Sequence, residues 1–412
     1  MQKAIPQPEP RKAAVAFIFS IVLLDVIALG IVIPVLPKLV ESMLGGDTPR
    51  AAELYGLFGT AWALMQFVCS PVLGALSDRF GRRPVLLISM LGLGFDYILM
   101  ALAPTLAWLF VGRIISGITS ASFSTAYAYI ADITPPEKRA GAFGLVGAAF
   151  GVGFVLGPAI GGLLGTVDPR LPFWIAAAFC LANAACGYFL LPESLPPERR
   201  MPFQWARANP VGSLRLLRTH HQLMGLAGVA FLSNLAHAVL PSVAVLYCSY
   251  RYGWSDQVMG LTLAAAGVGS GIVQGFLIRP AIGWFGERNA LAVGLLFGTV
   301  GFAVYGVAET SAWFWSGLPL MALWGLASPA LMGIMTRHVG GSEQGQLQGA
   351  NASLMAVANL IGPTLFGFIF AWSITPAAAL HLPGAPFLLA SALLGAGAVV
   401  AWQVTRPALA PA

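Results

Sequence analysis

Three ionisable side chains lie inside long apolar segments of the first half of the chain. They are Asp25, Asp96 and Arg113, in a sequence where charged residues make up only 9% of the total. An ionisable group near the centre of a lipid bilayer is costly, so each one needs a partner or a task. Proton uptake and release suits such a carboxyl group, because burial disfavours its charged form and a nearby Arg favours it.

The depths of these groups fit that chemistry. At about 1.5 Å per residue, Asp25 lies about 16 Å into the first apolar segment, near the expected midplane. Asp96 and Arg113 lie at similar depths on consecutive, antiparallel segments and could pair. Two interpretations of that pair stay open, a purely structural ion pair or a proton-transfer pair. Asp25 has no evident local partner and is our first candidate for the protonation site, with Asp96 the second.

The elements that position these groups are long apolar helices. Hydrophobic residues make up 58% of the 412 residues, which indicates a polytopic membrane protein. Apolar runs bounded by turn or charge clusters predict twelve spans, near 14–40, 56–76, 84–104, 107–130, 141–165, 172–192, 222–248, 256–279, 289–309, 312–335, 346–371 and 386–404. The first run resembles a signal peptide, but it is long and contains Asp25, so we expect a retained helix.

The basic residues predict the orientation. The chain has 22 Lys and Arg residues, and a cytoplasmic N-terminus places all but five of them on the cytoplasmic side. The exceptions are Lys38, Arg50, Arg170, Arg251 and the intramembrane Arg113. We therefore expect a multi-pass protein with both termini in the cytoplasm. This distribution accounts for the net charge of +6 without a nucleic-acid partner.

The spans divide into two sets of six. We expect an N-terminal half at 1–192, a cytoplasmic linker at 193–221 and a C-terminal half at 222–412. The stretches GLVGAAFGVGFVLGPAIGG and GANASLMAVANLIGPTLFG place Gly157 and Pro158 in register with Gly362 and Pro363, 205 positions later. Two duplicated halves around a cavity are the architecture of alternating-access transporters.

Polar side chains on several spans are candidates for that cavity. They are Gln66, Ser116, Ser120, Gln274 and Asn351, with His237 as the one titratable group deep in the second half. Interhelical hydrogen bonding is the alternative for each of them. For His237 the alternative is a neutral packed residue.

Two further clusters stand out, one for conformational change and one for helix packing. The stretch GALSDRFGRRPVLL contains Gly74, Asp78, Arg79, Gly81, Arg82 and Arg83, whereas the second-half equivalent IRPAIGWFGERNAL lacks an acid matching Asp78. The positive-inside rule explains the arginines but not Asp78, so we expect a one-sided conformational latch. The second cluster, GVGFVLGPAIGG, contains Gly153, Gly157, Pro158, Gly161 and Gly162, which permit close helix contact and a bend.

No sequence signature of an enzyme is present. The chain has no Walker A sequence, zinc signature or nucleophile elbow, and its four cysteines lie in apolar runs without metal-binding spacing. We therefore expect neither catalysis nor a bound metal or cofactor.

The stretches GALSDRFGRRPVLL and GVGFVLGPAIGG, with the six-plus-six layout, resemble the major facilitator superfamily along the whole chain. LLDVIALGIVIPVLP, GRIISGITSAS and YIADITPPEKRAGAFG resemble the first half of bacterial tetracycline efflux proteins; LYCSYRYGW and QGQLQGANASLMAVANLIGP are weaker matches. The resemblance implies an all-α membrane protein with 12 transmembrane helices in two pseudo-symmetric halves. It also implies drug/proton antiport in the bacterial inner membrane, with Asp25, Asp96 and Arg113 as coupling charges, Gln66 as a cavity residue and the latch described above.

The second half departs from that family. Ser270 and Gly298 stand where the family carries an intramembrane His and an acidic residue. His237 is our candidate to replace the missing titratable group. A divalent cation is expected only if it is carried with a tetracycline-like substrate.

We therefore expect a proton-driven exporter of an amphipathic small molecule, working as a monomer with protons and lipid as its other partners. A metabolite or sugar facilitator or symporter of the same fold is the first alternative. A transport-inactive membrane sensor or scaffold is the second, and it is disfavoured by the latch sequence and the three buried charges.

Overall fold

The computed structural model describes residues 12–120, 123–135, 138–202, 221–340, 343–375 and 381–406. These parts of the chain contain helices and no strand, which confirms the all-α prediction. The helices of the first half are α1 (Lys12–Val32), α2 (Leu36–Met43), α3 (Thr48–Phe80), α4 (Arg82–Leu102), α5 (Leu106–Ser120), α6 (Phe123–Ile133), α7 (Arg139–Gly165) and α8 (Leu171–Leu190).

The helices of the second half follow the same order of long apolar elements. They are α9 (His221–His237), α10 (Val239–Tyr252), α11 (Asp256–Ile272), α12 (Ile278–Val307), α13 (Ser311–Trp324), α14 (Ala327–Arg337), α15 (Gln344–Ile374) and α16 (Ala385–Val404). A π-helical turn, Val273–Leu277, joins α11 to α12. Most of the expected linker, 203–220, lies outside the described residues, and the division into domains stays a prediction.

Eleven helical stretches among the described residues are long and apolar enough to cross a membrane. One of them, Asp256–Val307, has 52 residues. A helix of that length measures about 78 Å, more than twice the hydrocarbon core of about 30 Å. Its helical geometry breaks at Gly286, where φ is 73° and ψ is 162°. The stretch therefore makes two crossings, and the total agrees with the twelve predicted spans.

Several predicted spans contain an interruption that hydropathy alone does not show. The span expected at 14–40 is divided into α1 and α2 around Pro34, which has no N–H group to continue the helix. The Val35 N–H bonds the Val32 carbonyl in a tight turn there. The spans at 222–248 and 312–335 are also divided, into α9 with α10 and α13 with α14, without a proline between the two parts.

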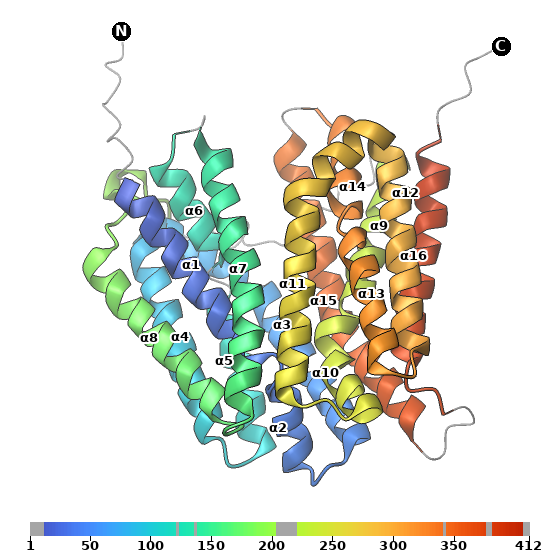
Figure 1. Cartoon of the computed structure of the whole chain (residues 1–412). Coiled ribbons are helices and arrows are strands. Elements are labelled where there is room, and N and C mark those ends of the chain that lie inside the picture. The colour runs from blue at the N-terminus through green and yellow to red at the C-terminus, as the bar shows by residue number, and fades with distance from the viewer. Residues whose placement is uncertain are drawn as a thin grey trace, which may run out of the picture.

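Figure 1 shows the arrangement of the helices. The described part of the chain begins at α1 and finishes at α16 on the same side of the molecule, which we call the upper end. The turn between α3 and α4 lies at this upper end. The short helix α2 and the start of α11 lie at the opposite, lower end.

The two halves meet near the lower end through glycines. A Cβ atom built on Gly260 of α11 would lie 2.3 Å from the Pro158 carbonyl oxygen of α7. A Cβ atom on Gly56 of α3 would lie 2.6 Å from the Pro363 carbonyl oxygen of α15. Pro158 and Pro363 are the residues paired by the repeat, so the two crossings are related by the internal symmetry. Only glycine permits this approach of backbone to backbone.

The same helices separate toward the upper end. Cβ atoms built on Gly144, Gly147 and Gly151 of α7 would meet no atom within 4 Å among the described residues, and neither would those on Gly271 and Gly275 of the α11 side. Figure 1 shows α7 and α11 diverging upward from their lower contact. The structure is therefore closed between the halves at the lower end and open at the upper end.

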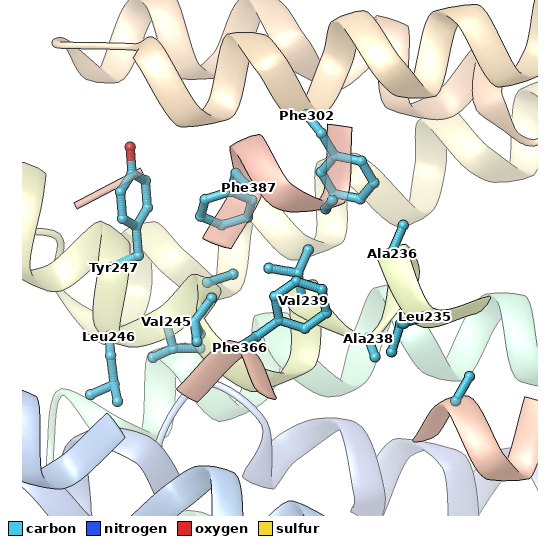
Figure 2. Packing of buried hydrophobic residues seen from close by; sticks show 14 of the residues in the cluster. Leu235, Ala236, Ala238, Val239, Val245, Leu246, Tyr247, Phe302, Phe366 and Phe387 are labelled. Carbon is cyan, nitrogen blue, oxygen red and sulfur yellow. The ribbon is translucent and has the colours of Figure 1, made fainter. Parts of the chain in front are cut away.

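An aromatic core holds the second half together. Tyr247 of α10 packs edge-on against Phe387 of α16, with ring centroids 4.8 Å apart, and its hydroxyl donates to the Tyr305 carbonyl at 2.8 Å. Phe302 and Phe387 stack beside Val239, as Figure 2 shows. These contacts join α10, α12 and α16, and the first two of these helices line the cavity described below.

Candidate transport site

Asp25 lies in α1 and is 9% exposed. The side-chain amide of Asn183, on α8, donates to Asp25 Oδ1 at 2.9 Å and to the Ile21 carbonyl at 2.9 Å. The sequence shows no local partner for Asp25; its partner comes from α8, 158 positions later in the chain. Among the described residues Asp25 has no ion pair, and the Asn183 amide that donates to it is neutral.

The glycine cluster of α7 positions the helix that carries Asp25. A Cβ atom on Gly153 would lie 2.8 Å from Val26 Cβ, one on Gly157 would lie 2.7 Å from Gly30 Cα, and one on Gly161 would lie 2.0 Å from the Ile31 carbonyl oxygen. The other two members of the cluster, Pro158 and Gly162, face α11 of the second half. One stretch of α7 therefore contacts both the Asp25 helix and the opposite half.

Asp96 and Arg113 do not form the ion pair that their depths suggested. Asp96 on α4 is 1% exposed and lies against Gly112 of α5, and neither of its carboxyl oxygens has a hydrogen-bond partner among the described residues. Arg113 Nη2 donates instead to Ser116 Oγ at 2.9 Å. The Arg113 side chain thus lies along its own helix, where the hydroxyl one turn away accepts its hydrogen bond.

A cavity of about 510 Å³ lies within the second half. Its polar lining includes Asn234, His237, Ser270, Gln274, Ser328 and Asn351. The His237 ring lies against the Trp324 ring with centroids 5.7 Å apart and a tilt of 42°. No Asp, Glu, Lys or Arg is among the lining residues that the structure describes. The cavity can therefore hold an aromatic, amphipathic molecule between rings, amides and hydroxyls.

The expected cavity residues of the two halves differ in their location. Gln274, Asn351 and His237 line this cavity, whereas the first-half candidates Gln66, Ser116 and Ser120 do not. Ser116 and Ser120 are buried in helix contacts, and Gln66 is half-buried on α3. Gly298 lies outside the cavity, where a Cβ atom would meet Trp324 and Leu394 at 2.7 Å.

The lower end is closed by polar contacts between the halves. Lys38 Nζ of α2 pairs with Asp256 Oδ1 of α11 at 2.9 Å and donates to the Trp254 carbonyl at 2.6 Å. Thr60 of α3 and Thr364 of α15 share a hydrogen bond of 2.7 Å. These contacts must break for the lower end to open.

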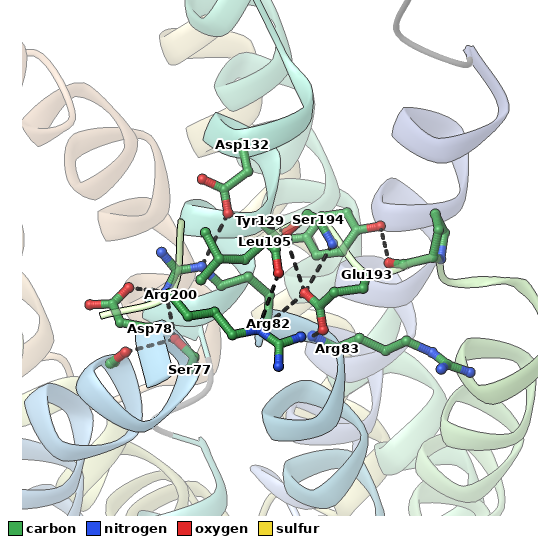
Figure 3. Close-up of polar contacts among 12 residues, drawn as sticks. Ser77, Asp78, Arg82, Arg83, Tyr129, Asp132, Glu193, Ser194, Leu195 and Arg200 are labelled. Carbon is green, nitrogen blue, oxygen red and sulfur yellow. Dashed lines mark hydrogen bonds and ion pairs between the residues drawn. The ribbon is translucent and has the colours of Figure 1, made fainter. Parts of the chain in front are cut away.

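The expected latch residues form a network at the upper end (Figure 3). Arg82 Nη1 pairs with Asp78 Oδ1 at 2.6 Å, and Arg82 Nε pairs with Asp132 Oδ2 at 3.1 Å, which joins the end of α3 to the end of α6. Gly81 supplies the left-handed backbone of the turn, with φ at 105°. All of these pairs lie inside the first half, so Asp78 does not bridge the halves in this conformation.

Glu193 completes the network. Its carboxylate accepts the backbone N–H groups of Arg82, at 2.9 Å, and Arg83, at 3.3 Å. These amides begin α4. A carboxylate at a helix N-terminus accepts hydrogen bonds from the free N–H groups and interacts favourably with the positive end of the helix dipole. Of the other latch candidates, Arg79 is exposed, Gly74 has open space beside it, and the Arg83 guanidinium reaches the Tyr188 carbonyl.

The second half repeats this turn with its charges exchanged. Gly286, 205 positions after Gly81, is also left-handed. Glu287 then stands at the place of Arg82, and Arg337 at the place of Asp132, and these two residues pair at 2.8 Å. The position of Asp78 is taken by Gly283. Each half thus has an ion pair between equivalent helix ends, but only the first half carries the additional acid.

Sequence reasoning missed Asp132, Glu193, Lys38 and Asp256 as site residues. The available signal was modest, since each is an acid or base at the edge of an apolar run. The 205-residue offset could have pointed to Asp132 and Arg337 together, because both end the fourth long element of their half.

Comparison with known proteins agrees with this architecture. The family model described as Major Facilitator Superfamily matches residues 18–363. Tetracycline resistance protein, class C, of Escherichia coli is 42% identical over 363 residues, which cover 87% of this chain and 90% of that protein. The class E protein of Escherichia coli is 37% identical over 350 residues, with 85% and 86% covered.

A solved structure shows the same fold over nearly the whole chain. The human organic anion transporter MFSD10 (TETRAN) superposes with a TM-score of 0.69 at 25% sequence identity, covering 95% of this chain and 99% of that one. The chain belongs to the major facilitator superfamily, and the tetracycline resistance proteins are among its relatives.

Proposed function

We propose that this protein exports an amphipathic small molecule across a bacterial inner membrane in exchange for protons. The observation that carries the proposal is Asp25, a buried carboxyl group inside a spanning helix that accepts a hydrogen bond from the neutral amide of Asn183. A group in that setting can gain or lose a proton when its surroundings change, which is the requirement for coupling. Asp96, Arg113 and His237 are the further coupling candidates.

The upper end faces the cytoplasm in this proposal. Arg79, Arg83, Arg199, Arg288 and Arg337 lie there, and cytoplasmic loops carry the excess of basic residues. Both termini are then cytoplasmic. The structure, open above and closed by Lys38 and Asp256 below, corresponds to the state that loads substrate from the cytoplasm.

Exchange follows from differential affinity of the two states. Substrate enters from the upper end and favours closure there, while the lower contacts break. Protonation of Asp25 from the lower side then favours return to the present conformation, and release of that proton to the cytoplasm allows loading again. Each ligand shifts the equilibrium only through its different affinity for the two states.

The second-half cavity supports a substrate with a flat aromatic body and several polar groups. His237 and Trp324 offer ring faces, and Gln274 and Asn351 offer hydrogen bonds. A tetracycline fits this description, and the relatives' names make it the first substrate to measure. A divalent cation enters this account only as part of such a cargo. We propose a monomer as the working unit.

Uptake by reconstituted vesicles tests the proposal. An imposed pH gradient should drive tetracycline accumulation in vesicles containing the protein, and a protonophore should abolish it. Downhill flux of a neutral sugar without dependence on the gradient would favour the facilitator alternative. The absence of any flux from folded protein would favour a sensor or scaffold.

A further inference from the structure

A second cavity, of about 460 Å³, lies at the upper end of the second half, apart from the transport site. It is formed where α9, α12, α14 and α16 end or turn. Its charged and titratable lining consists of Glu287, Arg288, Arg337, His338 and Arg406. Three guanidinium groups against one carboxylate give the cavity a net positive charge.

The basic side chains are held in place by their neighbours. The Arg288 guanidinium lies 4.1 Å from the centroid of the Trp402 ring, and its Nε donates to Thr405 Oγ1 at 3.2 Å. Arg337 pairs with Glu287 and neutralises that carboxylate. Arg288 therefore keeps its positive charge without an acidic partner among the described residues, and so does the exposed Arg406.

In the first half, a carboxylate occupies the place that is equivalent to this cavity by the internal repeat. There the carboxylate of Glu193 accepts the N–H groups of Arg82 and Arg83, directly after the left-handed Gly81 (Figure 3). The backbone turns similarly at Gly286, but no described side chain takes the part of Glu193 at the amides that follow. In the first half the Glu193 carboxylate binds at this position, whereas in the second half the position is a basic cavity.

The surroundings of the cavity are apolar. Trp284 is 80% exposed and Phe285 54% exposed, immediately before Gly286. Exposed aromatic rings beside basic residues at the end of a membrane helix are typical of the lipid headgroup region. Basic cavities between helices on the cytoplasmic side bind anionic headgroups.

We propose that this cavity binds a phosphate group, supplied by an anionic phospholipid of the cytoplasmic leaflet. The phosphate accepts hydrogen bonds from Arg288 and Arg406, and the acyl chains lie along Trp284 and Phe285. Because the cavity joins α12, α14 and α16, the bound lipid stabilises the second half at the end that closes during transport.

The test uses the full chain in nanodiscs of phosphatidylcholine, with phosphatidylglycerol added stepwise and the thermal midpoint as readout. The midpoint should rise and saturate. In the double variant Arg288→Gln with Arg406→Gln, half-saturation should need about 25-fold more phosphatidylglycerol, at about fivefold for each charge lost. If the double variant does not fold, Arg406→Gln alone replaces it in the test. Half-saturation of that single variant should need about fivefold more phosphatidylglycerol.

A matched control removes two charges from the upper end of the first half. Lys138→Gln with Arg199→Gln, both exposed and outside the cavity, should leave half-saturation within about twofold of the wild type. An identical response of the two double variants would overturn the site. A rise produced by inorganic phosphate in pure phosphatidylcholine, with none from phosphatidylglycerol, would overturn the lipid as the source.

Discussion

Asn183 donates a hydrogen bond of 2.9 Å to Asp25, from α8 to α1. The same amide group donates to the Ile21 carbonyl one turn earlier, which fixes the orientation of the side chain. Asp25 is thus held by a neutral donor that can remain in contact with either form of the carboxyl group. This relationship makes Asp25 the centre of the proposed coupling.

The glycine contact at the lower end predicts a conformational phenotype. In Gly260→Ala the new methyl group would collide with the Pro158 carbonyl oxygen and with Gly162, which are backbone atoms and cannot turn away. Overpacking of this kind costs about 1–3 kcal/mol. We expect the transport rate to fall about tenfold or more, measured in vesicles at equal protein content. Gly283→Ala, where nothing lies within 4 Å, is the control and should transport normally.

The latch predicts a separation of rate from affinity. Asp78 pairs only within the first half in this conformation and is 43% exposed, so it is available to the second half when the upper end closes. Asp78→Ala should lower the maximal transport rate about tenfold and change the half-saturating substrate concentration by less than about twofold. Glu309→Ala removes an exposed acid from the lower end as control. Equal rates for Asp78→Ala and wild type would reduce this stretch to a topology signal.

The Glu193 cap predicts a loss of stability. Glu193→Gln removes the negative charge from the N-terminus of α4, which should cost about 1 kcal/mol. The thermal midpoint in detergent should fall relative to wild type. Glu198→Gln, an exposed acid five residues later, should leave it unchanged. Matching midpoints for the two variants would mean that the Arg82 and Arg83 amides are satisfied without the charge.

His237 can be tested for two roles at once. His237→Phe keeps a ring against Trp324 but removes the nitrogen atoms that bind a proton, whereas His237→Ala removes both. We expect the Phe variant to bind substrate within about threefold of wild type and the Ala variant to bind up to about tenfold more weakly, as ring contacts of this kind are worth about 0.5–1.5 kcal/mol. The Phe variant should also shift the dependence of transport on pH, while the dependence due to Asp25 remains. An unchanged pH dependence would exclude His237 from coupling.

The spans were predictable because each is a run of apolar residues long enough to cross a bilayer. The left-handed turns at Gly81 and Gly286 could also be predicted from the sequence, because a glycine is followed by a charged residue in both repeats. The breaks at Pro34 and at the ends of α9 and α13 were not, since hydropathy continues across them.

The partners of the buried charges depended on tertiary packing. Asn183 reaches Asp25 only because α8 lies against α1, and no local spacing encodes that contact. Arg113 had two acceptors at comparable depth, and the hydroxyl of Ser116 on its own helix is the one it uses. Ser116 and Ser120 do not line the cavity because they are buried in helix contacts, and their spacing along one helix face is compatible with either place.

The most direct test of the account is gradient-driven transport by Asp25→Asn. The amide is nearly the same size and can still contact Asn183, but it cannot carry a proton. We predict that reconstituted Asp25→Asn protein remains folded, exchanges tetracycline downhill, and accumulates none of it when a pH gradient is imposed. Accumulation at the wild-type level by this variant would contradict the assignment of Asp25 as the coupling group.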